Sequence, residues 1–294
     1  MQCDLCGSAM EFGLTRWHTR CRCCHLERSS LSPDINGLNV MDESERAAAL
    51  HALRIQNFST LLAWLARECP PTPSSRMLEV GCAHGWFMEQ ARTQYCVQGI
   101  EPDTTIANQA MAKGLDVRQG FFPSALAEGE VFDIIVFNDV LEHIPDVRAV
   151  LAHCHAHLTA GGHVVINAPD SRGCFYRASK WLARLGRLRS FERMWQLGLP
   201  SPHLYYFNTR AIAKLAQATG FTLEKSIVLP AILTRGLARR IHYAGGMSEH
   251  KAYFLAGCIR ILMPLIKISG HDIRVWLLKK HPNSNESKAA VISS

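Results

Sequence analysis

The sequence predicts an α/β fold in which a parallel sheet carries helices on both faces, and three observations lead to this prediction. Of the 294 residues, 48% are hydrophobic and 19% are charged, so the chain can build a sizeable core. From Arg76 onward, apolar strand patterns alternate with helical patterns, which is typical of a parallel sheet. A small-residue turn, Gly81–Gly85, follows the first strand, and ligands bind beyond the carboxyl ends of such strands.

The segment before the sheet is expected to hold a linker and one helix. Residues Ser30–Asn39 are rich in Ser, Pro, Gly and Asn, which is typical of a linker. Acidic residues in Asp42–Glu45 favour a helix start, and apolar residues then recur at helical spacing to about Cys69. The run Pro70–Pro73 ends this helix because proline removes a backbone donor.

The alternating region predicts strands separated by helices and turns. The expected strands are Met77–Val80, Cys96–Ile100, Asp116–Gln119, Phe132–Phe137 and His163–Ala168. The expected helices include Trp86–Gln94 and Asp146–Leu158, and the pair Gly161–Gly162 is expected to form a turn before the last of these strands.

The chain opens with a cysteine cluster that predicts a structural zinc site. Two Cys-x-x-Cys pairs are formed by Cys3, Cys6, Cys21 and Cys24. Four thiolates at this spacing can take the tetrahedral arrangement that Zn²⁺ prefers, and they leave no open position for catalysis. The alternatives are Cys23 or His25 in place of Cys24, or reduced thiols without metal. A segment of about forty residues rarely holds a fold by apolar burial alone, so the metal would supply stability.

The two parts of the chain carry opposite net charge. Residues 1–170 hold 12 Lys and Arg against 20 Asp and Glu, a net charge of −8. Residues 171–294 hold 20 against 5, a net charge of +15. A basic surface of this kind favours anionic partners such as phospholipid, nucleic acid or an acidic substrate, although a solvated surface with a sign bias is the plainer interpretation.

The sequence gives no sign of a targeting or membrane-spanning segment. The first thirty residues lack the apolar stretch of a secretory signal. The most apolar window, Ala252–Ile266, contains Arg260 and Pro264 and is shorter than the roughly twenty residues that span a bilayer. Eleven cysteines without such a signal indicate thiols or metal ligands in a reducing compartment. We therefore expect a cytoplasmic protein that contacts the inner face of the membrane at most peripherally.

An acidic residue at the end of the second strand indicates an adenosine-type cofactor. Glu101 follows Glu79 by 22 residues, and an acid at this place can accept hydrogen bonds from both hydroxyls of a ribose. The Gly81–Gly85 turn lets the backbone approach a ligand closely. Its spacing differs from the Gly-x-Gly-x-x-Gly of dinucleotide-binding proteins.

Four motifs together resemble those of the class I S-adenosylmethionine-dependent methyltransferases. They are Leu78–Gly85 (motif I), Gly99–Asp103 (the ribose-binding motif), Phe132–Asp146 (the fourth-strand motif of small-molecule and glycan methyltransferases) and Leu158–Gly162 (the fifth-strand turn). The resemblance covers about residues 76–170 and continues more weakly through His203–Phe221 and Asp272–Lys280. A cysteine-rich N-terminal module also occurs in some sugar-modifying members, which is a looser similarity.

The resemblance implies a Rossmann-like, seven-stranded methyltransferase sheet with helices on both faces. We divide the chain into a zinc-ribbon-like module at 1–30, a linker and helix at 31–70, and a methyltransferase domain at 71–282. Helical insertions are expected at about 173–202 and 230–270, and a disordered tail at 283–294.

The resemblance also implies which residues hold S-adenosylmethionine. The cofactor site would be lined by Glu79, Gly81, Cys82, Gly85, Glu101 and Asn138. Ala83 stands where the family often has a glycine, and Gly120–Phe121 stands where many members have an acid near the adenine. We expect Phe121 or Phe122 to pack on the adenine instead.

Two histidines are candidates for a general base. A base needs a pKa near the working pH, which makes histidine the first choice. By the resemblance, His203 lies at the edge of the substrate pocket, whereas His143 follows the fourth strand, where the family often uses a histidine to brace a loop. We favour His203 over His143.

The insertion Arg172–Arg193 predicts a basic amphipathic helix. Seven Lys and Arg residues stand among aromatic and leucine residues there, and the segment 235–267 repeats the mixture. Helices of this kind are either lids over a pocket or contacts with an anionic membrane surface.

The sequence thus predicts an S-adenosylmethionine-dependent methyltransferase that acts on a small molecule, a sugar or a lipid-linked glycan. The alternatives are an RNA methyltransferase that holds its substrate with the zinc module and the basic half, and a cofactor-binding scaffold without turnover. Nucleic acid is disfavoured because Asn138–Leu141 stands in place of the Asn-Pro-Pro-aromatic motif of base methylation. The intact glycine turn and Glu101 argue against the scaffold. The acceptor atom and the oligomeric state are not predicted.

Overall fold

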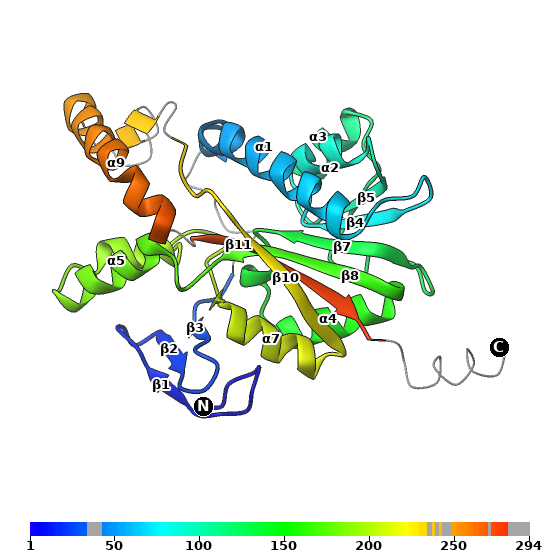
Figure 1. Cartoon of the computed structure of the whole chain (residues 1–294), viewed down its shortest axis with the longest axis horizontal. Helices are drawn as coiled ribbons and strands as arrows, with labels where there is room; N and C mark the ends of the chain where they lie inside the picture. Colours follow the sequence, from blue (N-terminus) through cyan, green and yellow to red (C-terminus); the bar gives the residue numbers. More distant parts are fainter. Residues whose placement is uncertain (34–42, 234–236, 239–240, 243–247, 270–271, 282–294) are drawn as a thin grey trace.

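The computed structural model describes residues 1–33, 43–233, 237–238, 241–242, 248–269 and 272–281. These residues form two β-sheets (Figure 1). The small sheet has the order β1-β2-β3-β9, where β1 is Met10–Phe12, β2 is His18–Cys21, β3 is Glu27–Ser29 and β9 is Tyr205–Tyr206. The large sheet has seven strands in the order β10-β11-β8-β7-β4-β5-β6. The tail expected at 283–294 lies outside the described residues.

The large sheet confirms the α/β class and the seven-stranded arrangement. Its strands are β4 (Arg76–Val80), β5 (Cys96–Glu101), β6 (Val117–Gln119), β7 (Phe132–Asn138), β8 (Leu158–Pro169), β10 (Phe221–Leu229) and β11 (Ile273–Lys280). Strand β11 lies between β8 and β10 and is antiparallel to both, whereas β8, β7, β4, β5 and β6 are parallel. The alternating pattern predicted a parallel sheet. The reversed strand arises because the helix before β11 stands away from the sheet and does not form a crossover on it (Figure 1).

Helices cover both faces of the large sheet. Helices α1 (Glu43–Glu68), α2 (Trp86–Ala91) and α3 (Thr104–Ala112) lie on one face, and α4 (Val147–Ala156) and α7 (Thr209–Ala218) lie on the other (Figure 1). Successive strand residues point to opposite faces. Met77 of β4 therefore packs in the cluster that contains Leu61 of α1, whereas the next residue, Leu78, lies in the cluster that contains Leu151 of α4.

The helical insertions differ in detail from the sequence prediction. The single helix expected over Arg172–Arg193 is two helices, α5 (Cys174–Arg184) and α6 (Arg189–Met194). Gly186 follows α5 with a left-handed φ of 81°, which is typical of the residue that ends a helix. The second insertion is described in part and contains α9 (Glu249–Ser269), which lies at the same end of the molecule as α5 (Figure 1).

The pair Gly161–Gly162 lies inside β8 and not before it. Gly161 has a left-handed φ of 74°. The pairing of β7 with β8 shifts register between Phe132 and Ile134, so the two glycines form a bulge in a continuous strand.

Strand β9 joins the N-terminal module to the rest of the chain. Strand β3 pairs with it in antiparallel register, with Glu27 opposite Tyr206. The backbone amide of Ser29 donates to the carbonyl of Leu204 at 2.9 Å, and the Ser29 hydroxyl donates to the carbonyl of His203 at 2.8 Å. The module therefore holds the segment that carries His203. The domain boundaries at residues 30 and 70 stay predictions.

A buried ionic cluster centred on Glu27 stabilises this junction. Oε2 of Glu27 lies 2.8 Å from Nε2 of His18 and accepts a hydrogen bond from the Tyr176 hydroxyl at 2.7 Å. Oε1 pairs with the ammonium group of Lys180 in α5. Burial alone would raise the pKa of Glu27, but the bond with His18 and the charge of Lys180 outweigh burial and lower this pKa from 4.5 to about 2.

Replacing Glu27 with glutamine should destabilise the chain, whereas the same change at Glu11 in β1 should not. Removing one partner of a buried ion pair costs about 3–5 kcal/mol, because Lys180 loses its counter-charge and His18 loses a hydrogen-bond partner. The solvent-exposed pair of Glu11 with Arg22 contributes only about 0–1 kcal/mol. Because the pKa of Glu27 is lowered, its contribution is present above pH 4.5 and is lost as the pH falls toward 2. Urea unfolding at neutral and acid pH measures both effects, and equal midpoints for the two variants would contradict the prediction.

Candidate functional site

The turn after β4 brings its backbone close to the end of β5. The amides of Gly81 and Cys82 both donate to the carbonyl of Ile100, at 2.8 and 3.0 Å. Gly81 has a left-handed φ of 70°, and a Cβ there would lie 2.6 Å from Cγ2 of Val140. Because neither the conformation nor the space admits a side chain, this position requires glycine.

Glu101 ends β5 with a carboxylate that backbone amides hold in place. Its Oε2 accepts from the amide of Ala83 at 2.8 Å, and its Oε1 accepts from the amide of Asp103 at 3.0 Å. Burial raises the pKa of Glu101 above 4.5, although the two amides oppose the rise. The carboxylate and the turn thus fix each other, and the remaining lone pairs of the carboxylate can accept bonds from ribose hydroxyls.

A buried polar chain crosses the carboxyl ends of β4, β7 and β8. Nδ2 of Asn138 donates to Oε1 of Glu79 at 2.8 Å, and Nδ2 of Asn167 donates to Oδ1 of Asn138 at 3.2 Å. Burial raises the pKa of Glu79 to about 8, although the bond from Asn138 opposes the rise. Among the described residues, Oε2 of Glu79 has no hydrogen-bond partner. A buried oxygen of this kind suits a ligand ammonium group. The sequence pattern did not single out Asn167, whose signal is a polar residue near the end of an apolar strand.

The other residues around the turn occupy different environments. The side chain of Cys82 is buried in a cluster with Met88, so a contact of Cys82 with a cofactor would come from its backbone. Gly85 has a left-handed φ of 74° and stands at the N-cap of α2. Phe121 is exposed, whereas Phe122 packs against the core. Of the two expected adenine neighbours, Phe121 is the more accessible.

The two candidate bases lie together, beside an acidic residue that the sequence pattern did not single out. The ring centroids of His143 and His203 are 4.8 Å apart. The possible ligand atoms of these two residues and Glu142 all lie within 4.8 Å of one another. Glu142 is 0% exposed and His203 is 6% exposed, and His143 is half-buried. Position alone therefore does not separate the two histidines.

Contacts between two distant segments bring these residues together. His143 belongs to the short 3₁₀ helix η1 (Leu141–His143), 60 residues before His203. The amide of Leu204 donates to the carbonyl of Glu142 at 2.8 Å. Nδ1 of His143 donates to the carbonyl of Pro202 at 3.0 Å. The helix η1 is thus held against the segment that leads into β9.

Glu142 is a buried carboxyl group, and among the described residues neither of its oxygens has a hydrogen-bond partner. Burial raises the pKa of Glu142 well above 4.5, and the charge of Asp139 adds to the rise. Nη2 of Arg54 lies 3.9 Å from Oδ2 of Asp139. The charge of Arg54 acts on both Glu142 and Glu79, so the cluster of Glu142 and the two histidines adjoins the polar chain at β4.

The cysteine cluster predicted at the N-terminus is confirmed. Its four sulfur atoms, which lie within 4.8 Å of one another, belong to Cys3, Cys6, Cys21 and Cys24. The sulfurs of Cys3 and Cys24 are 3.6 Å apart, and those of Cys6 and Cys21 are 3.4 Å apart. The alternative ligands Cys23 and His25 are not members of this set.

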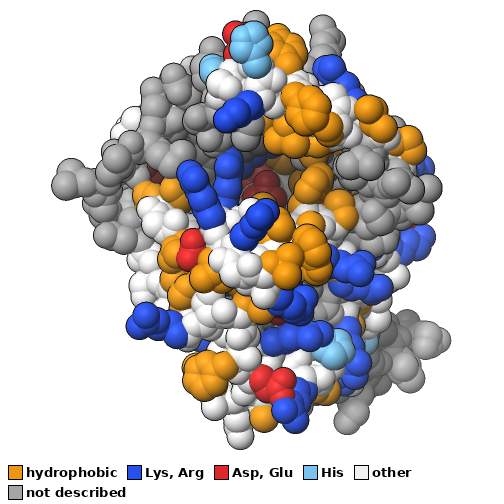
Figure 2. Space-filling model, turned by 90° about the vertical axis from the view of Figure 1, so that its left-hand side faces the viewer, with side chains coloured by type: hydrophobic (Ala, Val, Ile, Leu, Met, Phe, Trp, Pro, Cys, Tyr) orange, Lys and Arg blue, Asp and Glu red, His pale blue; other side chains and the backbone are white. Residues whose placement is uncertain are grey.

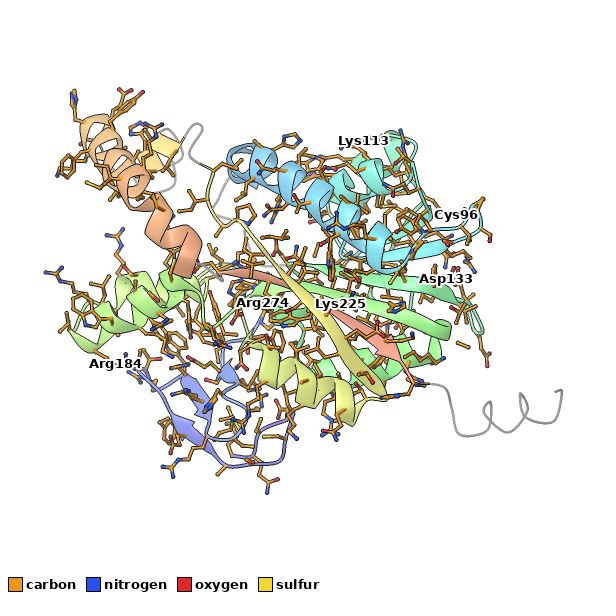
Figure 3. All side chains as sticks on the ribbon, in the orientation of Figure 1. Cys96, Lys113, Asp133, Arg184, Lys225 and Arg274 are labelled. Carbon is orange, nitrogen blue, oxygen red and sulfur yellow. The ribbon has the colours of Figure 1, made fainter. Side chains whose placement is uncertain are left out.

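The site residues lie at the end of the sheet that faces the insertions. Figure 3 shows Cys96 and Asp133, near the starts of β5 and β7, at the opposite end of the molecule from Arg184 of α5. The parallel strands therefore run toward α5. Figure 2 shows this side, where a recess with acidic side chains at its floor is bordered by hydrophobic and basic side chains. Ligands are expected to enter there, because the strands end on this side.

Three features define the chain as a class I S-adenosylmethionine-dependent methyltransferase. They are a seven-stranded sheet with one reversed strand, a glycine turn after β4 and an acidic residue at the end of β5. The profile of a family described as "Methyltransferase domain" matches residues 52–226, more than half of the chain. The chain belongs to this family.

The curated relatives include ubiquinone biosynthesis O-methyltransferases. The one from Cronobacter sakazakii is 29% identical over 129 residues, which cover 41% of this chain and 51% of the relative. The one from Paramagnetospirillum magneticum is 35% identical over 101 residues, which cover 31% of this chain and 39% of the relative. The chain thus spans about half or less of the length of these relatives.

Solved structures share the fold at low sequence identity. A Haemonchus contortus phosphoethanolamine N-methyltransferase, in complex with phosphomonomethylethanolamine and S-adenosylhomocysteine, has a TM-score of 0.56 and 18% identity, covering 83% of this chain and 59% of that one. The magnesium protoporphyrin IX methyltransferase of Synechocystis has a TM-score of 0.51 and 14% identity, covering 84% and 91%. In the described part of the chain, the helices are too short or too polar to cross a membrane.

Proposed function

We propose that the chain transfers the methyl group of S-adenosylmethionine to a small-molecule, sugar or lipid-linked glycan acceptor. The observation that carries this proposal is the placement of Glu79, Glu101 and Asn138 at the carboxyl ends of the neighbouring parallel strands β4, β5 and β7. Membership of the methyltransferase family supports it. The work of the protein is to align the acceptor with the methyl group and, for a hydroxyl acceptor, to take up a proton.

The residues around the turn fit the cofactor. Oε2 of Glu79, which is buried without a hydrogen-bond partner in the described structure, would accept from the amino group of the methionine part. Glu101 would accept from the ribose hydroxyls, and Asn138 holds Glu79 in position. Gly81 and Gly85 bring no side chain at the two ends of the turn, where a Cβ would meet Val140 or Leu115. When bound, S-adenosylmethionine supplies an electrophilic methyl group.

We place the reacting group of the acceptor beside His143 and His203. Both lie at the carboxyl-end side of the sheet, and Arg54 connects their neighbour Glu142 electrostatically with Glu79. Oxygen is the favoured acceptor atom, because the curated relatives are named O-methyltransferases. Transfer to a hydroxyl releases a proton, and an imidazole is the first candidate to receive it.

We also propose that the N-terminal cluster binds one structural Zn²⁺ ion. Four convergent thiols without a ligand of another kind are typical of closed structural zinc sites. The ion would order β1, β2 and β3. Because β3 pairs with β9, the ion would also stabilise the segment that carries His203.

The side of the molecule that holds the insertions is proposed to contact an anionic membrane surface from the cytoplasm. Trp181 of α5 is 60% exposed and Phe254 of α9 is 76% exposed. Basic side chains lie among the hydrophobic ones on this face (Figure 2). A lipid-linked acceptor would then reach the recess from the membrane side.

Incubating the purified chain with methyl-labelled S-adenosylmethionine and fractionated cell extract tests the proposed function. Label should enter a lipid, glycan or small-molecule fraction, and the Glu101→Gln variant should transfer much less of it. Label found in RNA would refute the proposed acceptor class. If the chain binds the cofactor but labels no fraction, the proposal is wrong and the scaffold alternative is favoured.

Sedimentation with acidic phospholipid vesicles should show binding at low salt that fades as salt rises. Each basic residue near an anionic membrane contributes about 1 kcal/mol, and salt screens this attraction. The double variant Trp181→Ser and Phe254→Ser should bind several-fold less, because two apolar contacts are lost. Met111→Ser is the control, since Met111 is exposed and belongs to α3, which lies away from this side of the molecule (Figure 1). If the chain does not bind acidic vesicles at low salt, the proposed membrane contact is wrong. The helices of the insertions would then be interpreted as lids over the pocket, and a soluble acceptor would be favoured.

A further inference from the structure

We propose that the four-cysteine cluster is also a site of reversible thiol oxidation, through which hydrogen peroxide detaches the N-terminal module from the segment that carries His203. The four sulfurs lie in two close pairs, Cys3 with Cys24 at 3.6 Å and Cys6 with Cys21 at 3.4 Å. Thiols this close can be joined by a disulfide after a small rotation of their side chains. Because zinc binds thiolates, oxidation of a pair and zinc binding exclude each other.

Cys6 is the member of the cluster that an oxidant in solution can reach. It is half-buried, whereas Cys21 and Cys24 are fully buried and Cys3 is nearly so. An oxidation-sensitive cysteine is typically accessible and lies beside a second thiol that resolves its first oxidation product. Cys21, whose sulfur is 3.4 Å from that of Cys6, is this second thiol.

The oxidation proceeds in two balanced steps. The Cys6 sulfur attacks hydrogen peroxide, so that a sulfur–oxygen bond forms, the oxygen–oxygen bond breaks and one water leaves. The Cys21 sulfur then attacks the sulfenic acid on Cys6, so that the disulfide forms and a second water leaves. The two thiols lose two electrons and two protons, and the peroxide is reduced to two waters. Zinc is neither oxidised nor reduced and passes into solution, and a thiol reductant reverses the disulfide.

The first Cys-x-x-Cys turn contacts the rest of the chain directly through Asp4. The Tyr205 hydroxyl lies 3.2 Å from Oδ2 of Asp4 and 2.6 Å from the carbonyl oxygen of Pro145, which follows η1. The carbonyl of Asp4 accepts from Nη1 of Arg148 in α4 at 3.2 Å. Asp4 stands two residues before Cys6. Movement of Cys6 therefore disturbs contacts with β9 and with α4.

The second Cys-x-x-Cys turn is joined to the same segment on its other side. The amide of Cys21 donates to the carbonyl of Leu26 at 2.8 Å, and Leu26 leads directly into β3, which pairs with β9. Nδ2 of Asn208, two residues after β9, donates to the carbonyl of His25 at 2.9 Å. His25 follows Cys24 directly. Both turns of the cluster thus hold the segment around β9.

Opening the cluster is therefore expected to loosen β9 and, through it, the short helix η1. The amide of Leu204, directly before β9, donates to the carbonyl of Glu142 in η1. The turn after β4 is held by hydrogen bonds to Ile100 and is expected to change less. The effect on activity rests on the proposed methyl transfer, in which His143 and His203 border the acceptor. Oxidation should then lower the transfer and leave cofactor binding nearly unchanged.

Stepwise addition of hydrogen peroxide to the full, zinc-loaded chain tests the site without any acceptor. A chromogenic zinc chelator should report one Zn²⁺ released per chain, and peptide mass spectrometry should find a disulfide between Cys6 and Cys21. Hydrogen exchange, which reports local opening, should rise at residues 141–143 and 203–207 and stay low in β4. A thiol reductant together with Zn²⁺ should restore the original pattern.

The matched controls are Cys23→Ser and Cys96→Ser, which remove a half-buried and an exposed thiol outside the four-cysteine cluster. Both variants should release zinc at the same peroxide concentration as the wild type. Retention of zinc while other cysteines are oxidised would overturn the proposal, and so would a disulfide that involves Cys23. Zinc release without a rise of hydrogen exchange at residues 203–207 would overturn the connection with β9.

Methyl transfer and calorimetry separate this inference from the proposed function. The oxidised chain should transfer about 10- to 100-fold less label, since a misplacement of about 1 Å can cost about 100-fold in rate. Its affinity for S-adenosylmethionine should stay within about twofold of that of the reduced chain. Full transfer after zinc release would overturn the inferred control of activity. If the reduced chain labels no fraction, the proposed function is wrong, whereas zinc release and hydrogen exchange still decide whether the oxidation site exists.

Discussion

Replacing Glu101 with glutamine is expected to weaken the binding of S-adenosylmethionine by about 10- to 150-fold, which corresponds to the roughly 1.5–3 kcal/mol of a hydrogen bond to a charged group. The carboxylate is fixed by the amides of Ala83 and Asp103, so its position at the end of β5 requires no rearrangement when a ligand binds. A glutamine side chain has the same shape but lacks the charge. It also turns an NH₂ group toward one of the two amides, which opposes binding further.

Isothermal titration calorimetry measures this effect, and thermal unfolding shows whether the turn itself is weakened. The matched control is Glu128→Gln, which neutralises an exposed carboxylate away from β5 and should leave the affinity as it is. An affinity of Glu101→Gln equal to that of the wild type would remove Glu101 from the cofactor site.

The proximity of Glu79, Glu101 and Asn138 could be predicted from the sequence because its signals are local. A glycine turn directly follows an apolar strand, and Glu101 and Asn138 each end a strand of the same kind. In a parallel sheet the carboxyl ends of neighbouring strands meet at one edge, so local patterns are enough to bring these residues together. The four-cysteine cluster was predictable for the same reason, because a Cys-x-x-Cys turn fixes its own geometry.

The cluster of Glu142, His143 and His203 could not be predicted in the same way, because its geometry depends on contacts between distant segments. His143 and His203 were weighed against each other as separate candidates, yet they lie side by side. They meet because the amide of Leu204 bonds to Glu142, and because β9 pairs with β3 of the N-terminal module. No periodicity in the sequence records either contact. The reversed direction of β11 was missed for the same reason, since it depends on where the chain goes between residues 230 and 272.

The N-terminal module therefore has a structural connection to the cluster of Glu142, His143 and His203. Ser29 of β3 donates to the carbonyl of His203, and Glu27 connects the module to Tyr176 and Lys180 of α5. A change that unfolds the module would release both the segment of His203 and the start of the first insertion. The carboxyl ends of β4 and β5 have hydrogen bonds of their own besides the apolar cluster that they share with the module, so they should depend on the module less than the segment of His203 does.

Replacing Cys6 with serine is expected to remove the proposed zinc ion from the cluster and to unfold the N-terminal module. Binding of structural zinc contributes about 10–16 kcal/mol to small zinc-binding peptides, so a module of this size should not stay folded without the metal. Elemental analysis should show one zinc equivalent fewer than in the wild type. Limited trypsin digestion should cut the variant within residues 1–33, where the wild type is resistant.

The control for this prediction is Cys23→Ser, because Cys23 is half-buried in the same module but is not one of the four convergent thiols. This variant should keep its zinc and its resistance to trypsin.

The Cys6→Ser variant should still bind S-adenosylmethionine. The hydrogen bonds that hold the turn after β4 and the carboxylate of Glu101 do not involve the four cysteines. Methyl transfer by this variant should fall, because the segment of His203 loses the support of β3. A folded, trypsin-resistant N-terminus without zinc would contradict the prediction, because apolar packing alone would then hold the module. If Cys23→Ser lost as much zinc as Cys6→Ser, the assignment of the four ligands would be wrong.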